Sequence, residues 1–236
     1  MTRRGRGLFV TGTDTGVGKT EVACALIRAA ARHNLTVVGM KPLAAGARRV
    51  NGVLTNADVA AMRQASTIRP ARALVNPYLL EPPIAPHLAA REAGIRLELG
   101  VVLRAYRALS ERAQVVVVEG AGGFRVPLDA RRDMSDLAQR LRLPVVLVVG
   151  MRLGCISHAL LASEAIARRG LVLAGWVANR IDPAMRRYRD NVSALVERLP
   201  APLLADVPYV TGSRARATAL DRAFDAGLLS RWFHGC

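Results

Sequence analysis

One segment constrains the fold of this chain more than any other: an apolar run that ends in a glycine-rich turn and continues into a helical pattern. Residues 7–12, GLFVTG, are predicted to form a buried strand, and residues 21–33 space their apolar side chains at helical intervals. TGTDTGVGKT, residues 11–20, joins the two. A glycine-rich turn that opens a helix with Gly-Lys-Thr is typical of a phosphate-binding loop, because main-chain N–H groups and the positive end of the helix favour an anion.

The spacing of the glycines is unusual for such a loop. In the common pattern four residues separate the first glycine from Gly-Lys-Ser/Thr, which requires a glycine where this chain has Thr13. Gly12 lies one residue earlier. The segment is therefore either a plain strand-to-helix turn with a capping threonine or a variant phosphate loop.

The alternation of strand-like and helix-like segments continues to the end of the chain. Further strands are predicted at residues 35–42, 113–123, 143–150, 171–180 and 201–208, and helices at 57–65, 96–112, 133–141, 157–169, 183–199 and 214–229. Continuous apolar strands that alternate with helices favour a parallel sheet covered on both faces. We expect an α/β fold of the P-loop NTPase type, with a doubly wound, mainly parallel sheet, and a single domain over residues 1–236. Residues 76–87, rich in proline, are expected to be irregular.

The composition argues against several other classes of protein. Lysine and arginine number 34 against 18 acidic residues, a net charge of +16, but the arginines are scattered and no nucleic-acid-binding module is recognisable. We expect a solvated basic surface and no nucleic-acid partner. The three cysteines are too few and too widely spaced for a disulfide or metal framework, and no apolar run is long enough to cross a bilayer. Without the apolar stretch of a secretory signal, a cytoplasmic protein with no membrane partner is predicted.

Only two of the 34 basic residues are lysines, Lys19 and Lys41. In a chain that uses arginine almost everywhere, a lysine indicates a place that needs a compact, rotatable ammonium rather than a planar guanidinium. Lys19 lies in the glycine-rich loop, where it would neutralise phosphate charge. Lys41 lies at the end of a predicted strand and is either a second functional cation or a surface lysine.

Three oxygen-bearing side chains are candidates for a Mg²⁺ site beside the loop. Thr20 follows Lys19, in the place of the metal-binding hydroxyl of phosphate loops. Glu119 follows four valines of a buried strand, so it faces either a cation or solvent. Asp58 lies in the first turn of a predicted helix, where the helix dipole alone would stabilise it. Chemistry alone leaves these alternatives open.

A set of motifs, in order along the chain, resembles the ATP-dependent dethiobiotin synthetase family. The motifs are TGTDTGVGKT, GMKPLAAG, NADV, VNPY, APH, VEGAGG, VVLVVGMRLGCISHALL, GWVAN and PAPLLADVP, and they extend over residues 8–210. In that family the phosphate loop is the long form, with five residues between its glycines. The spacing at Gly12 therefore agrees with the resemblance.

The resemblance implies a ring-closing ligase of biotin biosynthesis, which makes dethiobiotin from 7,8-diaminononanoate, CO₂ and ATP with Mg²⁺. A carbamate forms on one amine, ATP phosphorylates the carbamate, and the second amine attacks the mixed anhydride and expels phosphate. Carbamate and γ-phosphate are both anionic, so such a site needs cations to hold them together. Lys41 matches the family's catalytic lysine, which stands between these groups, and Lys19 and Thr15 lie in the loop near them.

Further roles follow from the same resemblance. Thr20, Asp58 and Glu119 match the positions that bind Mg²⁺ and phosphate. Asn179 matches the residue that reads adenine, and Pro208 a residue beside the base. The other residues implied at the nucleotide are Gly16, Val17, Gly18, Glu21, Gly120, Ala121 and Gly122.

The substrate site is implied to lie at a homodimer interface. The start of a helix is offered across that interface to the substrate carboxylate, and the matching residues here are Gly154, Cys155, Ile156 and Ser157. Two positions depart from the family pattern. Ala45 stands four residues after the catalytic lysine, where Ser or Thr usually contacts the substrate, and Gly16 stands where some members have glutamate.

Two alternative functions use related folds. An amide-forming ligase would normally carry an attached glutaminase domain, for which 236 residues leave no room. A partition-type or septum-positioning switch ATPase would carry an additional lysine early in the phosphate loop, and residues 12–16 contain none. The ring-closing ligase is therefore the preferred interpretation.

Overall fold

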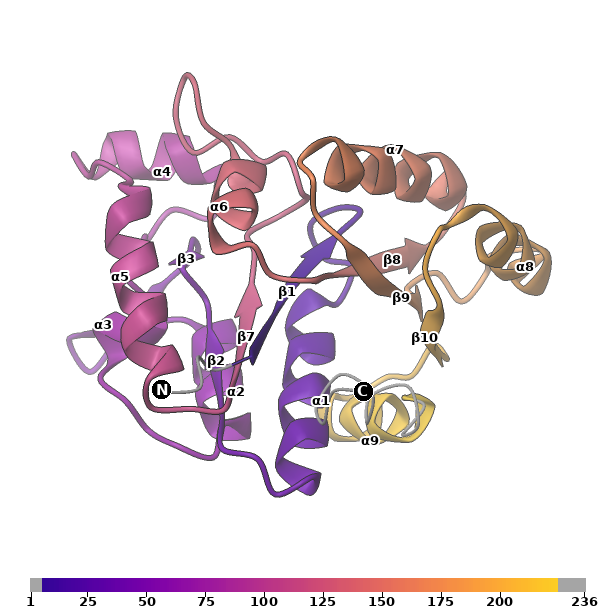
Figure 1. Cartoon of the computed structure of the whole chain (residues 1–236), viewed down its shortest axis with the longest axis horizontal. Helices are drawn as coiled ribbons and strands as arrows, with labels where there is room; N and C mark the ends of the chain where they lie inside the picture. Colours follow the sequence, from indigo (N-terminus) through magenta and orange to yellow (C-terminus); the bar gives the residue numbers. More distant parts are fainter. Residues whose placement is uncertain (1–5, 225–236) are drawn as a thin grey trace.

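The computed structural model describes residues 6–224, and a six-stranded sheet of parallel strand pairs forms its centre (Figure 1). The strands lie in the order β10-β9-β8-β1-β7-β2. Their bounds are Arg6–Gly12 for β1, Val37–Met40 for β2, Val115–Glu119 for β7, Val145–Met151 for β8, Leu173–Arg180 for β9 and Leu203–Val207 for β10. The doubly wound, mainly parallel sheet predicted from the sequence is confirmed.

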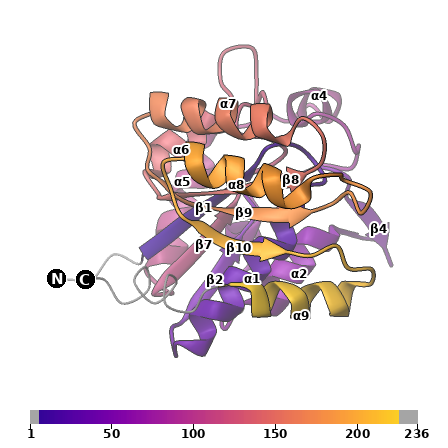
Figure 2. The same ribbon diagram turned by 90° about the vertical axis from the view of Figure 1, so that its right-hand side faces the viewer.

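Helices cover both faces of this sheet (Figure 2). One layer contains α1 (Lys19–Arg32), α2 (Ala57–Ala65) and α9 (Ser213–Ala223), and the other α5 (Leu99–Ser110), α6 (Met134–Leu141), α7 (Cys155–Arg168) and α8 (Tyr188–Arg198). Side chains of one strand alternate between the layers, as expected for a pleated strand: Leu8 and Val10 pack with α1, and Phe9 packs with α5 and α6. Within residues 6–224 no helix has the length and apolar composition needed to cross a membrane.

Several short elements were not predicted from the sequence. They are α3 (Arg72–Val75), α4 (Pro86–Glu92), the parallel pair β3 (Leu43–Ala44) with β6 (Tyr78–Leu79), and the antiparallel pair β4 (Arg48–Val50) with β5 (Val53–Thr55). The prediction of an irregular segment at 76–87 was wrong in part, since β6 lies within it and α4 begins there.

Some predicted boundaries were also wrong. The helix predicted at 183–199 begins only at Tyr188, because the preceding residues form turns, one of them closed by the Asp182 carboxylate that accepts the N–H of Ala184 at 2.8 Å. The helix predicted at 157–169 begins earlier, at Cys155. The last predicted helix, 214–229, is observed as α9, Ser213–Ala223, and residues 225–229 of the prediction lie outside the described residues.

All six strands of the central sheet run in one direction, so their carboxyl ends meet at one edge. At that edge the chain leaves β1 through the glycine-rich loop, β2 at Lys41 and β10 at Pro208, and β7 ends at Glu119. β1 lies between β7 and β8, where the winding of the sheet reverses. In open parallel sheets this is the place where ligands bind.

Candidate active site

The phosphate loop joins β1 to α1, and packing explains its unusual glycine spacing. A Cβ on Gly12 would lie 2.6 Å from Cγ2 of Val17 and 3.2 Å from the carbonyl oxygen of Asp14, because the loop folds back over this position. The next residue uses its side chain: the Thr13 hydroxyl accepts the N–H of Gly150 at 3.2 Å. The loop therefore needs a glycine at position 12 and tolerates a threonine after it.

The second glycine of the loop packs against β9. Gly18 precedes α1 with a φ of 89°, in the left-handed region, and a Cβ there would lie 2.3 Å from Nδ2 of Asn179. That amide is buried and donates to the carbonyl oxygen of Val17 at 2.8 Å. Asn179 is thus held against the loop by a contact that only glycine permits.

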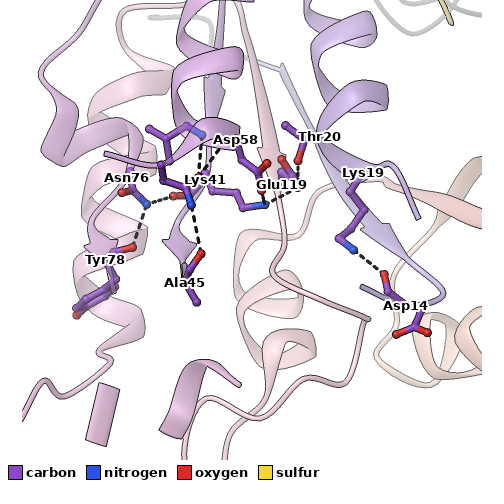
Figure 3. Close-up of polar contacts among 11 residues, drawn as sticks. Asp14, Lys19, Thr20, Lys41, Ala45, Asp58, Asn76, Tyr78 and Glu119 are labelled. Carbon is purple, nitrogen blue, oxygen red and sulfur yellow. Dashed lines mark hydrogen bonds and ion pairs between the residues drawn. The ribbon is translucent and has the colours of Figure 1, made fainter. Parts of the chain in front are cut away.

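A buried cluster of charges lies beside the loop (Figure 3). Lys41 is 5% exposed, and its Nζ donates to Oε1 of Glu119 at 2.5 Å and to Oδ2 of Asp58 at 3.0 Å. The Thr20 hydroxyl donates to the same Glu119 oxygen at 2.9 Å. Burial alone would lower the pKa of Lys41, but the two carboxylates outweigh it and raise that pKa, so the amine is held as an ammonium. Burial raises the pKa of Glu119, against the opposing charge of Lys41.

Two asparagines fix the backbone around this cluster. Asn76 is buried, and its Nδ2 donates to the carbonyl oxygen of Lys41 at 2.7 Å. Asn56 caps α2: its Oδ1 accepts the N–H of Asp58 at 3.0 Å, and its Nδ2 donates to the carbonyl oxygen of Ala45 at 3.2 Å. Side-chain amides therefore set the positions of Lys41 and Asp58.

Lys19 lies apart from this cluster, folded back on its own loop (Figure 3). Its Nζ donates to the carbonyl oxygen of Asp14 at 2.6 Å. Burial lowers the pKa of Lys19 to about 8, and the charge of Glu119 offsets part of this effect. Lys19 therefore has an ammonium that is costly to bury and that an incoming anion would stabilise.

A cavity of about 930 Å³ at the carboxyl edge of the sheet brings most of the predicted residues together. Those that line it are Thr15, Gly16, Gly18, Lys19, Thr20, Glu21, Lys41, Ala45, Asp58, Glu119, Ala121, Gly122, Asn179 and Pro208. Val17 and Gly120 are not among the lining residues. The carbonyl oxygen of Val17 holds Asn179, and the N–H of Gly120 donates to Val10 in β1 at 2.9 Å.

The residues predicted to bind the substrate carboxylate lie elsewhere. Gly154, Cys155, Ile156 and Ser157 are not among the described residues that line the cavity. They form the start of α7, with Gly154 as N-cap and Cys155 buried. Within one copy of the chain, this helix start is therefore separate from the cavity.

Other lining residues were missed by the sequence interpretation. They include Pro83, Ile84, Arg180, Tyr209, Val210 and Arg216. Arg216, on α9, donates from Nη1 to Oε1 of Glu21 at 3.3 Å, and 195 positions separate the two residues. No local pattern in the sequence signals a contact between segments so far apart.

The oxygen atoms of the charge cluster suit a hard cation such as Mg²⁺. Oε2 of Glu119 is buried without a hydrogen-bond partner, and the Thr20 hydroxyl is bonded to the other oxygen of the same carboxylate. Carboxylate and hydroxyl oxygens are the ligands that Mg²⁺ prefers. No group of three or more His, Cys, Asp or Glu side chains is placed to hold a metal within residues 6–224, so this site would rest on Thr20, Asp58 and Glu119.

The fold and the site together define a class of protein. A glycine-rich loop follows the central strand of a parallel sheet, and Lys19 and Thr20 open the helix behind it. These are the features of P-loop nucleotide-binding proteins.

Comparisons with known proteins narrow this class. A family model described as an AAA domain matches residues 6–217. The protein called ATP-dependent dethiobiotin synthetase BioD of Aromatoleum aromaticum is 56% identical over 208 residues, 88% of this chain and 92% of that protein. The protein of the same name from Nitrosospira multiformis is 54% identical over 212 residues, 90% of this chain and 92% of that protein. The chain belongs to the dethiobiotin synthetase family.

A solved structure supports the fold alone. The ParA family ATPase of Chlorobium tepidum superposes with a TM-score of 0.55 at 14% sequence identity, over 98% of this chain and 99% of that chain. This ATPase thus shares the fold of the chain, but at this identity it carries no information about the reaction of the chain.

Proposed function

We propose that this chain is an ATP-dependent dethiobiotin synthetase, a ligase of biotin biosynthesis that joins 7,8-diaminononanoate and CO₂ into a cyclic urea while ATP is cleaved to ADP and phosphate. The observation that carries the proposal is the buried Lys41, whose ammonium meets Glu119 and Asp58 at the sheet edge that also holds the phosphate loop. Relatives that are 56% and 54% identical to the chain bear this enzyme's name.

The reaction requires positive charge at a defined place. One amine of the substrate attacks CO₂ and loses a proton, which gives a carbamate. An oxygen of the carbamate attacks the γ-phosphorus, and ADP leaves. The second amine then attacks the carbamoyl carbon, loses a proton, and phosphate leaves with that oxygen as the ring closes. In the phosphorylation step two anions approach each other, so fixed cations lower its barrier.

The two lysines supply this charge from different elements. Lys19, with the N–H groups of the loop, binds the β- and γ-phosphates. Its present partner is a carbonyl oxygen of the loop, at Asp14, which a phosphate oxygen would replace. Lys41, at the end of β2, stands between the carbamate and the γ-phosphate, and Thr15 lines the cavity on the loop side of these groups.

Thr20, Asp58 and Glu119 would hold Mg²⁺, which would neutralise part of the phosphate charge near Lys41. In the structure the ammonium of Lys41 lies between the two carboxylates, so Lys41 and a divalent cation would compete for the same oxygens. The Thr20 hydroxyl donates to Glu119 and orients its carboxylate, whether that carboxylate faces Lys41 or Mg²⁺.

The base of ATP is proposed to lie between Asn179 and Pro208, which line the cavity far along the sheet from Lys41. The Asn179 Nδ2 is bonded to Val17, so the amide presents Oδ1 on its other side. An acceptor in that place suits the exocyclic amine of adenine. The two departures from the family pattern also line the cavity: Ala45 offers no hydroxyl, and Gly16 has a φ of 74° with open space where a Cβ would lie.

The substrate carboxylate is proposed to bind at the start of α7 in a second copy of the chain. Two features support this homodimer. Gly154–Ser157 do not line the cavity of their own copy, and Leu153 beside them is 94% exposed. A helix N-terminus is a favourable place for a carboxylate.

The test of this function is an assay with 7,8-diaminononanoate, bicarbonate, Mg²⁺ and ATP, followed by mass spectrometry. We expect dethiobiotin and ADP in equal amounts, and little ADP when the diamine is left out. ATP hydrolysis that proceeds without the diamine, and no cyclic urea, would refute the proposal.

A further inference from the structure

Asp14 is the residue of the phosphate loop on which most contacts converge. Its carbonyl oxygen accepts from Nζ of Lys19 at 2.6 Å, and its Oδ1 accepts the N–H of Thr15 at 2.7 Å. Its Oδ2 lies 2.5 Å from Nη2 of Arg152. The proposed reaction uses Lys19 and Thr15 but gives neither Asp14 nor Arg152 a role.

A free carboxylate at this position would oppose nucleotide binding. Thr15 and Lys19, which contact Asp14, both line the cavity, so the phosphates of a bound nucleotide would lie close to the Asp14 side chain. The negative charges of the phosphates and of the Asp14 carboxylate would repel each other, more strongly at low ionic strength than at high ionic strength. The side-chain oxygen is nevertheless useful, because it fixes the N–H of Thr15. The negative charge therefore needs a compensating cation.

Arg152, the residue after β8, supplies that cation: its guanidinium pairs with the Asp14 carboxylate. The carbonyl oxygen of Arg152 accepts the N–H of Cys155 in the first turn of α7 at 3.0 Å. The end of β8 is also tied to the loop: the N–H of Gly150 donates to the Thr13 hydroxyl at 3.2 Å, and the N–H of Thr13 donates to the carbonyl oxygen of Val148 at 2.9 Å. The phosphate loop is thus joined to the end of β8 and to the residue that follows it, and among these contacts the Arg152–Asp14 pair is the charged one.

We propose that Arg152 is a positioning residue of the nucleotide site. Paired with Asp14, it neutralises the one carboxylate of the loop and holds the N–H of Thr15 where the phosphates bind. The inference rests on the proposed use of ATP. Its distinctive consequence is that Arg152 becomes dispensable once Asp14 has lost its charge, which would not hold for an arginine that binds phosphate directly.

The experiment measures the dissociation constant of ATP with Mg²⁺, without the diamine, by isothermal titration calorimetry. The variants are Arg152→Gln, Asp14→Asn, the double variant and Arg152→Lys. Asparagine removes the charge of Asp14 but keeps the Oδ1 acceptor for the Thr15 N–H. The matched control is Arg198→Gln at the end of α8, which removes one positive charge from an exposed pair with Glu197.

Arg152→Gln should weaken ATP binding about tenfold at low ionic strength, and less when salt screens the exposed carboxylate. Arg152→Lys and Arg198→Gln should bind ATP nearly as the unchanged chain does. Asp14→Asn should bind ATP at least as tightly as the unchanged chain. The double variant should recover most of the affinity that Arg152→Gln loses.

Three results would overturn the inference: unchanged affinity in Arg152→Gln, a double variant as weak as Arg152→Gln, or weakened binding in Asp14→Asn. If Arg152→Gln does not fold, the ATP affinity of Asp14→Asn tests the inference by itself. The proposed ring closure is tested separately, since a chain that binds ATP but makes no dethiobiotin leaves this test intact.

Discussion

At the scale of single residues, Lys41 carries most of the proposed chemistry. A guanidinium keeps its charge but is larger and planar, and it cannot occupy the point between Glu119 and Asp58 where the ammonium lies. Lys41→Arg should lower kcat for ring closure by about 100-fold or more, with little change in the dissociation constant of ATP. Steady-state kinetics and calorimetry measure the two quantities. The reverse exchange at a remote pair, Arg28→Lys opposite Asp221, should leave both unchanged. A near-normal rate in Lys41→Arg would contradict the role given to this lysine.

The lowered pKa of Lys19 predicts that nucleotide binding depends on pH. Its pKa is lowered to about 8, first by burial, so the free chain holds Lys19 charged below that pH and neutral above it. A bound phosphate favours the charged form, and therefore the affinity for ADP should fall as the pH rises from about 7.5 to 9.5. Lys19→Arg keeps its charge over this range and should give a flat profile, though with weaker binding. A flat profile in the unchanged chain would show that Lys19 does not titrate there.

The sequence predicted the site residues unevenly. The two lysines stood out because the chain has no others, and positions at a strand end and a helix start made Glu119 and Asp58 candidates for a metal site. Only the resemblance to the family gave Asn179 a role. The side chains that position these residues left no trace in the local pattern. Arg152 meets Asp14 across 138 positions of sequence, so only the folded chain reveals this contact.

At the scale of elements, the phosphate loop depends on one glycine packed against β9. Gly18 has a φ of 89° and no space for a Cβ, which would lie 2.3 Å from Asn179, whereas Gly52 has a φ of 75° and nothing within 4 Å of that position. Alanine at either position costs about 1–2 kcal/mol of unfolding free energy through the left-handed backbone. Only Gly18→Ala should also displace Asn179 and weaken ATP binding, by about tenfold or more. Thermal unfolding and calorimetry separate the two effects, and ATP binding that responds equally to both changes would contradict the packing argument.

Element length decided which parts of the fold could be predicted. The strand expected at 143–150 is observed at Val145–Met151, and the helix expected at 57–65 is observed at Ala57–Ala65, because several consecutive residues carry the pattern. β3 and β6 contain two residues each, too few for any periodicity, and form because tertiary packing places them side by side.

At the scale of the whole molecule, one copy of the chain leaves the predicted carboxylate site outside the cavity. Leu161 on α7 is 61% exposed on the same helix as Gly154–Ser157, so a dimer that buries this face would bring the helix start to a neighbouring cavity. Sedimentation should show dimers, and Leu161→Glu should give monomers with a raised KM for 7,8-diaminononanoate and unchanged ATP binding. Val172→Glu, at a residue that is 68% exposed just before β9, is the control and should remain dimeric. An unchanged chain that is monomeric and fully active would refute the shared site.

Transfer of oxygen from CO₂ to phosphate tests the proposed reaction most directly. In the proposed sequence a carbamate oxygen attacks the γ-phosphorus and leaves with phosphate when the ring closes. With ¹⁸O-labelled CO₂ added to unlabelled water, and product collected before the label exchanges, each phosphate should carry one labelled oxygen and dethiobiotin should keep the other. Unlabelled phosphate formed together with ADP would mean that water attacks ATP, and it would contradict the proposal that this chain phosphorylates a carbamate.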